Sequence, residues 1–236
     1  MRVIWLSFFH ALKFIRKDRM LLVAGVAPIL AGAAISFGVP FAGEMLTRFT
    51  GISGMLVPYY GLFTIFFSSI TPVMYCFVFA MVILEEHDEH IDRYLFVTGL
   101  GRRGYFVSRM VFPALAAFVV TAMLLPVFRL MPLSAGTIML LSLTGTLQGM
   151  IIELLIVTLS SNKLEGMAVT KLSSLMIFGA VLPYLVPAPL CYSLAFLPSF
   201  WVGMAMLNNV SGYMLISVLL AGVWIVGLQV RFYNKY

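Results

Sequence analysis

The residues best suited to chemistry lie in an acidic run that also carries two histidines. It reads Glu-Glu-His-Asp-Glu-His-Ile-Asp from Glu85 to Asp92. A zinc protease helix would place its histidines four residues apart around a glutamate, whereas His87 and His90 are three apart. We therefore predict no metal site and no catalytic residue here, and expect the solvated acidic end of a helix. The helix dipole disfavours carboxylates at a C-terminus, which indicates that the helix continues into the cytosol or that a basic partner lies nearby.

The stretch that follows, Asp92–Tyr105, alternates apolar and charged side chains and is interrupted by glycines. This pattern predicts a short amphipathic helix followed by a tight turn. The side chains that we expect to be exposed are Tyr94, Leu95, Leu100, Arg102 and Arg103. Exposed apolar groups on so short a loop indicate a protein surface to dock against, or the lipid head-group layer.

A second polar segment spans residues 160–171. Ser161 or Asn162 can cap a helix there, with Glu165 in its first turn. The segment is too short to be a catalytic domain. The chain also lacks the G-x-x-x-x-G-K-[ST] phosphate loop, so it cannot bind ATP by that device. If the protein works with ATP, the nucleotide site is on another polypeptide.

One acidic residue, Glu153, stands inside a long apolar run. A charged group at membrane depth is costly and usually faces protein or water. Gln148 and Gly149 share its helical face, and Gly145 with Gly149 forms a GxxxG match that permits close helix approach. Two roles remain open for Glu153. It could line a substrate path with Gln148 and Gly149, or it could make a structural hydrogen bond or ion pair, for instance to Arg109.

The elements that hold these residues follow from composition. Of the 236 residues, 62% are hydrophobic and 10% are charged, and the mean hydropathy is +1.05. Since a soluble domain is about 25% charged, the sequence predicts an all-α integral membrane protein with one transmembrane domain over residues 1–236. A span needs about 20 mostly apolar residues. The six predicted spans are 20–41, 59–84, 107–128, 134–159, 172–197 and 211–230.

The distribution of basic residues predicts the orientation of the chain. If the N-terminus is cytoplasmic, thirteen of the fifteen Lys and Arg residues lie on the inner side, and only Arg48 and Arg129 lie outside. The positive-inside rule then places both termini in the cytoplasm. We attribute the net charge of +6 to the ends of the spans and expect no nucleic-acid partner.

Two segments are predicted to be irregular. Residues 1–19 have helical amphipathic spacing and favour an interfacial helix, with Trp5 at the acyl boundary and basic side chains toward head groups. Pro183, Pro187 and Pro189 fall in the outer part of the fifth span, where proline breaks an ordinary helix. We therefore expect residues 183–209 to form a broken, partly re-entrant outer structure.

Two loop motifs add to the six-span layout. In the first inner loop, Glu86 precedes Leu-Phe-Val-Thr-Gly-Leu at 95–100, and then come Tyr105 and Arg109. In the second, Asn-Lys-Leu-Glu-Gly-Met-Ala occupies 162–168, and a Pro-rich outer segment follows. With these motifs in this order, nearly the whole chain resembles the membrane subunit of bacterial type-2 ABC exporters of the drug or peptide type. That family usually has proline where this chain has Gly99.

The resemblance implies a permease of the bacterial plasma membrane. Two copies would pair with two cytosolic ABC ATPase subunits, which bind ATP and Mg, while this chain binds no cofactor. The substrate would be an amphipathic drug, peptide or lipid-like molecule. In such transporters, inner-loop helices sit in clefts on the ATPase. The residues that the resemblance assigns to this coupling are Asp92, Tyr94, Leu95, Thr98, Gly99, Leu100, Arg102, Arg103, Tyr105, Asn162, Lys163 and Glu165.

Two other functions have weaker support in the sequence. An ion-coupled secondary transporter favours several acids at mid-membrane, and only Glu153 qualifies. An intramembrane enzyme has little support, because HExxH and GxSxG are absent. The Glu85-Glu86 pair is similar to that of a glutamate-type membrane protease, but His90 stands where that pattern requires arginine.

Overall fold

The computed structural model of the chain describes residues 2–52, 54–187 and 190–235, and every regular element within them is helical. The α-helices are α1 (Arg2–Ile15), α2 (Arg19–Thr50), α3 (Tyr60–Asp88), α4 (Ile91–Val97), α5 (Gly101–Phe106), α6 (Phe112–Val127), α7 (Ala135–Leu159), α8 (Lys163–Ser173), α9 (Leu182–Leu185), α10 (Pro198–Asn208) and α11 (Gly212–Lys235). The remaining turns are 3-10 helical in η1 (Val57–Tyr59), η3 (Ser174–Ala180) and η4 (Leu190–Leu194), and π-helical in η2 (Val107–Val111).

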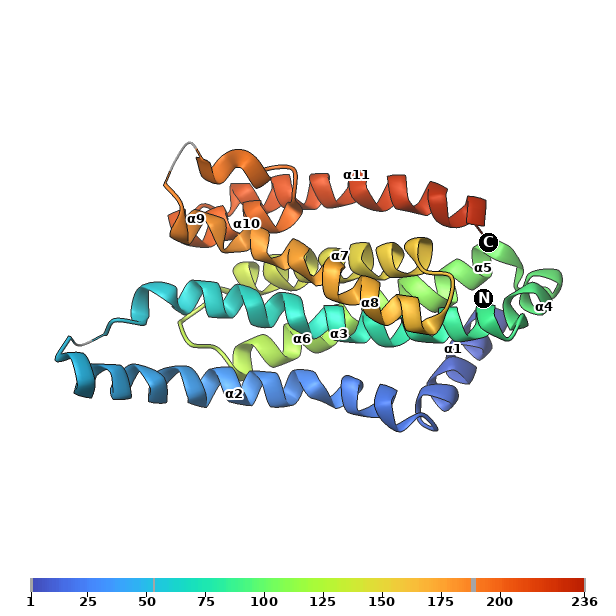
Figure 1. Cartoon of the computed structure of the whole chain (residues 1–236), viewed down its shortest axis with the longest axis horizontal. Coiled ribbons are helices and arrows are strands. Elements are labelled where there is room, and N and C mark those ends of the chain that lie inside the picture. Colours follow the sequence, from blue (N-terminus) through green and yellow to red (C-terminus); the bar gives the residue numbers. More distant parts are fainter. Residues whose placement is uncertain (1, 53, 188–189, 236) are drawn as a thin grey trace.

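Five helical stretches among the described residues are long and apolar enough to cross a membrane. They are Arg19–Thr50, Val57–Asp88, Gly101–Val127, Ala135–Leu159 and Gly212–Lys235. They confirm an all-α protein with candidate spans near five of the six predicted positions. Figure 1 shows both ends of the chain and α4 at the same end of the bundle. The cytoplasmic orientation of that end stays a prediction.

The predicted fifth span, 172–197, is not one continuous helix. It passes through the end of α8, then η3, α9 and η4. Pro183 is the second residue of α9 and Pro198 begins α10, while Pro189 lies outside the described residues. The broken structure is therefore confirmed, because proline removes a backbone donor wherever it interrupts a helix. The chain still runs from α8 near the termini to α9 at the opposite end (Figure 1), but its passage through a membrane stays a prediction.

The centre of the bundle is the contact between α3 and α7. The apolar windows of these two helices are each 78% buried, against 17% for α2 and α11, which lie at the periphery. Pro72 cannot donate to the carbonyl of Ser68, and Gly145 packs directly on that carbonyl. A Cβ atom at Gly149 would come within 3.0 Å of the Pro72 carbonyl. The GxxxG match therefore does allow the close helix approach expected of it.

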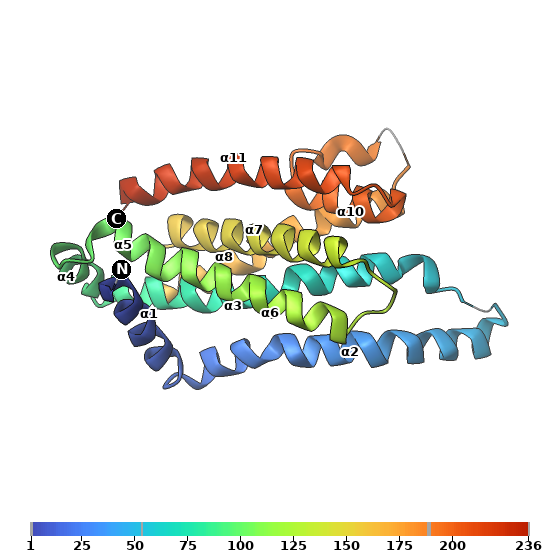
Figure 2. The same ribbon diagram turned by 180° about the vertical axis from the view of Figure 1, so that it is seen from behind.

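The N-terminal segment forms a separate helix, as predicted. Asp18 breaks the chain between α1 and α2 and caps α2, since its side chain accepts from the backbone N–H of Met20 at 2.9 Å. Phe8 packs on the protein, stacked 5.7 Å from Phe79, while Trp5 stays half-exposed. The helix thus lies across the base of α3 and η2 (Figure 2), and its position relative to a membrane stays a prediction.

Candidate functional site

The acidic run at the end of α3 makes ion pairs and hydrogen bonds with several other segments of the chain. Its helix continues to Asp88, beyond the predicted span end at Leu84. Basic partners lie nearby, so the expectation of a basic partner is confirmed, while the continuation into the cytosol stays a prediction. Glu85 pairs with Lys163 at 2.7 Å, Glu86 with Arg109 at 2.6 Å, and His87 with Asp92 at 2.7 Å. Asp88 accepts from the backbone N–H of Lys163. Four consecutive residues therefore join three different segments to α3.

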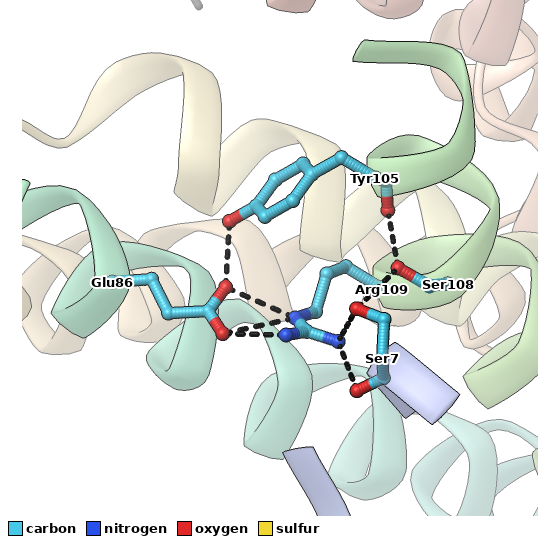
Figure 3. A network of polar contacts seen from close by, with 5 residues as sticks. All are labelled: Ser7, Glu86, Tyr105, Ser108 and Arg109. Atoms are coloured by element: carbon cyan, nitrogen blue, oxygen red, sulfur yellow. Dashed lines mark hydrogen bonds and ion pairs between the residues drawn. The ribbon is translucent and has the colours of Figure 1, made fainter. Parts of the chain in front are cut away.

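Glu86 and Arg109 form the centre of a buried polar cluster (Figure 3). The guanidinium donates from Nε to Oε2 at 3.0 Å and from Nη2 to Oε1 at 2.6 Å, which is the bidentate geometry of strong arginine–carboxylate pairs. Tyr105 donates its hydroxyl to Oε2 at 2.8 Å. Arg109 Nη1 donates to the Ser7 carbonyl at 2.9 Å and to its hydroxyl at 3.1 Å. The cluster, which also includes Ser108, ties α1, α3 and α5–η2 together.

A π-helical turn aims Arg109 at Glu86. Pro113 stands four residues after Arg109 and cannot donate to its carbonyl. The Phe112 N–H donates to the Val107 carbonyl, five residues back, so the backbone opens into the π pattern. Such turns inside α-helices are frequent at functional sites. The predicted third span began at Val107, yet the helix starts at Gly101 and carries the whole turn within it.

Helix α4 is fixed on its inner side and open on its outer side. Asp92, 2% exposed, accepts from His87 across the turn and anchors the start of the helix. Tyr94 and Val97 are 72% and 85% exposed and point away from the bundle. The prediction that Leu100 is exposed is wrong. It is 8% exposed, and Leu95 is half-buried against the same core.

The burial of Leu100 has a non-local cause. It packs in the core cluster that also contains residues of α1, α3 and α7. A Cβ at Gly104 would meet Leu100 at 3.0 Å and Ile4 of α1 at 3.5 Å, so the three lie together. Local sequence alone predicts that an apolar residue between charged residues is exposed. The local pattern does not show the contacts from distant segments that bury Leu100.

The turn between α4 and α5 depends on a different glycine from the one noted in the sequence. Gly101 has φ of 64°, which favours glycine, whereas Gly99 has open space around it and no positive φ among the described residues. Thr98 is extended, with ψ of 174°, and donates its hydroxyl to the Leu95 carbonyl at 2.7 Å. An extended residue is what a following proline requires, so the backbone here already suits the proline usual in the family.

The two arginines and Tyr105 have different surroundings. Arg102 and Arg103 are exposed at the tip, and Arg102 lies 5.8 Å from the centre of the Phe96 ring. Tyr105 is fully buried and belongs to the Glu86 cluster. Phe96 meets Tyr105 edge-on at 5.2 Å, so the tip and the buried cluster are in direct contact.

The second polar segment caps its helix as expected. Asn162 accepts from the Glu165 N–H at 2.9 Å, and Glu165 accepts from the Ser161 N–H at 2.7 Å. Lys163 turns inward to Glu85 and Asp18. In the same turn, the apolar side chain of Leu164 is 79% exposed. It was not among the residues predicted to contact an ATPase.

The ion pairs of Lys163 shift two pKa values. Burial alone would lower the pKa of Lys163, but hydrogen bonds to Glu85 and Asp18 outweigh it and raise the pKa above 10.5. Burial likewise opposes ionisation of Asp18, but Lys163 and the capped N–H groups of α2 lower its pKa below 3.8. Both groups are therefore charged at neutral pH.

The residues expected along a substrate path lie inside the bundle. Glu153 and Gln148 are 0% and 3% exposed. No hydrogen bond of good geometry reaches their side-chain oxygens from the described residues, although the Cys76 thiol is a neighbour of Glu153. Arg109 binds Glu86, so the suggested pairing of Arg109 with Glu153 is wrong. Gly149 packs on α3.

Several residues of this site were not predicted as functional. Ser7, Asp18 and Glu85 come from segments whose contacts are non-local. The pairing of Glu86 with Arg109 was not predicted, although their opposite charges near two predicted span ends were an available signal. Within the described part of the chain, no three His, Cys, Asp or Glu side chains gather closely enough to hold a metal ion.

Comparison with known proteins identifies the family of the chain. No curated protein and no solved structure matches the chain. The family described as "Fluoroquinolones export permease protein Rv2686c-like" matches residues 11–232, a range that begins in α1 and ends in α11 and includes both polar loops. The match confirms the resemblance to an exporter permease subunit, and the chain belongs to the Rv2686c-like family of fluoroquinolone export permeases.

Proposed function

We propose that this chain is the permease subunit of an ATP-driven ABC exporter in a bacterial plasma membrane. Two copies pair with two cytosolic ATPase subunits, which bind ATP and Mg, and the assembly moves an amphipathic molecule out of the cell. The family description supports a drug of the fluoroquinolone class over a peptide or lipid-like molecule. This chain supplies the membrane path and the contact that receives the motion of the ATPase.

The outward face of α4 is the observation that carries the proposal. Tyr94 and Val97 are exposed at the end of the bundle that holds both termini (Figure 1), and Leu164 is exposed at the start of α8. Exposure of such apolar side chains to water is unfavourable, and covering them would stabilise a complex by about 25 cal/mol per Å² of apolar surface. Arg102 and Arg103 beside them can bind carboxylates of the covering protein.

The bonds behind α4 support its role in transmitting motion. His87 connects α4 to α3, Glu86 connects α3 to η2, and Glu85 connects α3 to α8. Because α3 is helical over 29 residues, a displacement of α4 would move a rigid element that runs the length of the bundle. Lys163, Asp92 and Tyr105 therefore act as positioning residues, and the exposed side chains make the contact.

We also retain Glu153, Gln148 and Gly149 as a candidate substrate path. Buried polar atoms normally have partners. Among the described residues, no hydrogen bond of good geometry reaches the side-chain oxygens of Glu153 and Gln148, although the Cys76 thiol interacts with Glu153. That supports a second state in which α7 separates from α3 and these groups meet water or substrate. We expect Glu153→Gln to retain assembly with the ATPase but to lower transport. Normal transport by a normally assembled Glu153→Gln variant would remove this role.

The coupling proposal can be tested by co-purification with the candidate ATPase. The double variant Tyr94→Ala with Val97→Ser should lose ATPase binding or drug-stimulated ATP hydrolysis at least tenfold, as expected for an interface anchor. The matched control is Phe49→Ala. It removes an apolar side chain that is also exposed (83%) and that lies near the C-terminal end of α2, at the opposite end of the bundle from α4.

If the double variant retains full ATPase binding and full transport, α4 is not the coupling element. If Phe49→Ala causes the same loss, the effect is general destabilisation and gives no support to the proposal.

A further inference from the structure

The end of α2 and the start of α3 border a cavity that is open to the surface, far from the exposed face of α4. At 32 residues, α2 is about 48 Å long, whereas the hydrocarbon core of a bilayer is about 30 Å thick. With Arg19 at one interface, the turns after Pro40 reach the opposite head-group layer and the water beyond it. Figure 1 shows this end of α2 at the side of the molecule away from both termini.

Two glycines return the chain onto this end of α2. Gly51 takes φ of 70° and donates its N–H to the Thr47 carbonyl, which ends the helix. Gly54 takes φ of 74° and opens the turn into η1. Leu56 then comes back over Gly43, where an added Cβ would lie 3.8 Å from its Cδ1. The chain thus forms a wall opposite α2 before α3 begins.

The cavity between the two walls has a volume of about 440 Å³. That lies within the roughly 300–1,000 Å³ of typical small-molecule pockets. Its lining residues are Pro40, Gly43, Glu44, Thr47, Arg48, Gly54, Leu56, Val57 and Tyr60. One wall therefore carries an acid and a base, and the other carries apolar side chains and an aromatic ring.

The two charges of the cavity are unengaged. Glu44 and Arg48 are one helical turn apart, yet none of the ion pairs among the described residues includes either of them. Glu44 is the sole acidic residue in the predicted outer segments, while the remaining acids lie in the inner segments or in α7. At the other end of the bundle, Asp18, Glu85 and Glu86 have basic partners from distant segments, and among the described residues Glu44 has none of that kind.

We propose that this cavity binds a zwitterionic amphiphile. Glu44 receives an ammonium group, Arg48 receives a carboxylate or phosphate oxygen, and the apolar body lies against Leu56, Val57 and Tyr60. Charge-assisted hydrogen bonds of both signs would select a ligand that carries both charges. Such a ligand could be an exported amino-carboxylate drug or a phosphatidylethanolamine head group. If the ligand is the exported substrate, the cavity is an exit site, and this interpretation alone rests on the export function proposed above.

The simplest rival is an intrahelical pair. A glutamate four residues before an arginine can pair along a helix surface, with a stabilisation of only about 0.2–0.5 kcal/mol in isolated helices. Such a pair would serve α2 alone and would bind no ligand. Ligand binding and its dependence on each charge separate the two explanations.

The probe is norfloxacin, a fluorescent fluoroquinolone with a secondary ammonium and a carboxylate, and its binding to the purified full chain is followed by fluorescence anisotropy. We expect Glu44→Gln and Arg48→Gln each to weaken binding about tenfold, the loss typical of one charge-assisted contact. Arg129→Gln is the control, because Arg129 is exposed in a different predicted outer segment and does not line the cavity.

Two analogues assign the contacts. N-acetyl norfloxacin lacks the ammonium group, so its affinity should not change with Glu44→Gln but should still fall with Arg48→Gln. The methyl ester lacks the carboxylate and should show the reverse pattern. If Glu44→Gln and Arg48→Gln bind norfloxacin as wild type does, or lose no more affinity than Arg129→Gln, the proposed site is wrong.

The lipid source is tested in nanodiscs. If phosphatidylethanolamine displaces norfloxacin from wild type and phosphatidylglycerol does not, the head group is the occupant; equal binding in both bilayers identifies the drug. Transport with the ATPase is measured separately. Binding without transport would contradict the export function and leave this site standing, whereas transport with binding insensitive to Glu44 and Arg48 would contradict the site alone.

Discussion

Arg109 holds together segments that lie far apart in the chain. Its side chain is 3% exposed and bonds Glu86 of α3 and Ser7 of α1. A buried ion pair is not in itself evidence of high stability, because both charges lose water. Removing one partner is costly, however, because the other charge then stays buried without compensation.

This asymmetry gives a prediction for Glu86. The substitution Glu86→Gln should destabilise the protein by about 3 kcal/mol, since it leaves the Arg109 guanidinium uncompensated. Thermal unfolding in detergent measures the loss. The control Glu89→Gln removes the same charge from an exposed neighbour and should change stability by less than about 0.5 kcal/mol. Equal melting temperatures for the two variants would show that the cluster does not hold the helices together.

A junction of ion pairs connects the helices α2, α3 and α8. Lys163 at the start of α8 contacts Asp18 before α2 and Glu85 on α3. The pKa of Asp18 is lowered, so its ionised form contributes stability above about pH 3.8, and this is lost as pH falls through the lowered value. The pKa of Lys163 is raised, so its contribution is complete below about pH 10.5 and is lost as pH rises through the raised value.

The variant Lys163→Met should therefore melt lower than wild type between about pH 4 and pH 10. The side chains of Lys163 and Asp18 are partly exposed, so we expect a difference in melting temperature of about 2–4 °C. The difference should shrink when the pH is lowered to about 3. Melting curves of the two proteins across this range provide the measurement, and a difference that is constant with pH would contradict the role of the ion pairs.

Much of the arrangement of helices could be predicted because it depends on local pattern. Long apolar runs predicted five spans close to where they occur, and Asn162 with Glu165 predicted the start of α8. The π turn in η2 could not be predicted from charge and hydropathy, since it depends on backbone bonding around Pro113. The burial of Leu100 was not predicted because it lies in a core cluster against which Ile4 of the N-terminal helix also packs. Non-local packing decides what local pattern cannot.

At the scale of the whole molecule, the two ends of the bundle have different chemistry. One end holds the termini, α4, the start of α8 and a dense network of ion pairs. Lys235 adds to this end by donating to the Val157 and Ser160 carbonyls at the close of α7. The other end holds the long extension of α2 and the cavity with Glu44 and Arg48. A transporter that receives force at one end and releases cargo at the other requires such a division.

We propose that the exposed face of α4 lies in the cytoplasm and is covered by the ATPase. Val97→Cys tests it directly, because the native Cys76 and Cys191 are both buried and should contribute little labelling. Phe49→Cys, at the opposite end of the bundle, is the matched control. The measurement is labelling by a membrane-impermeant maleimide in intact cells and in inside-out vesicles, with and without the ATPase.

We expect Cys at position 97 to label only in inside-out vesicles and to be protected when the ATPase is bound, while Cys at position 49 labels only in intact cells and is unaffected by the ATPase. Labelling of position 97 from outside intact cells would contradict the orientation. Full labelling of position 97 in the assembled complex would contradict α4 as the surface on which the ATPase docks.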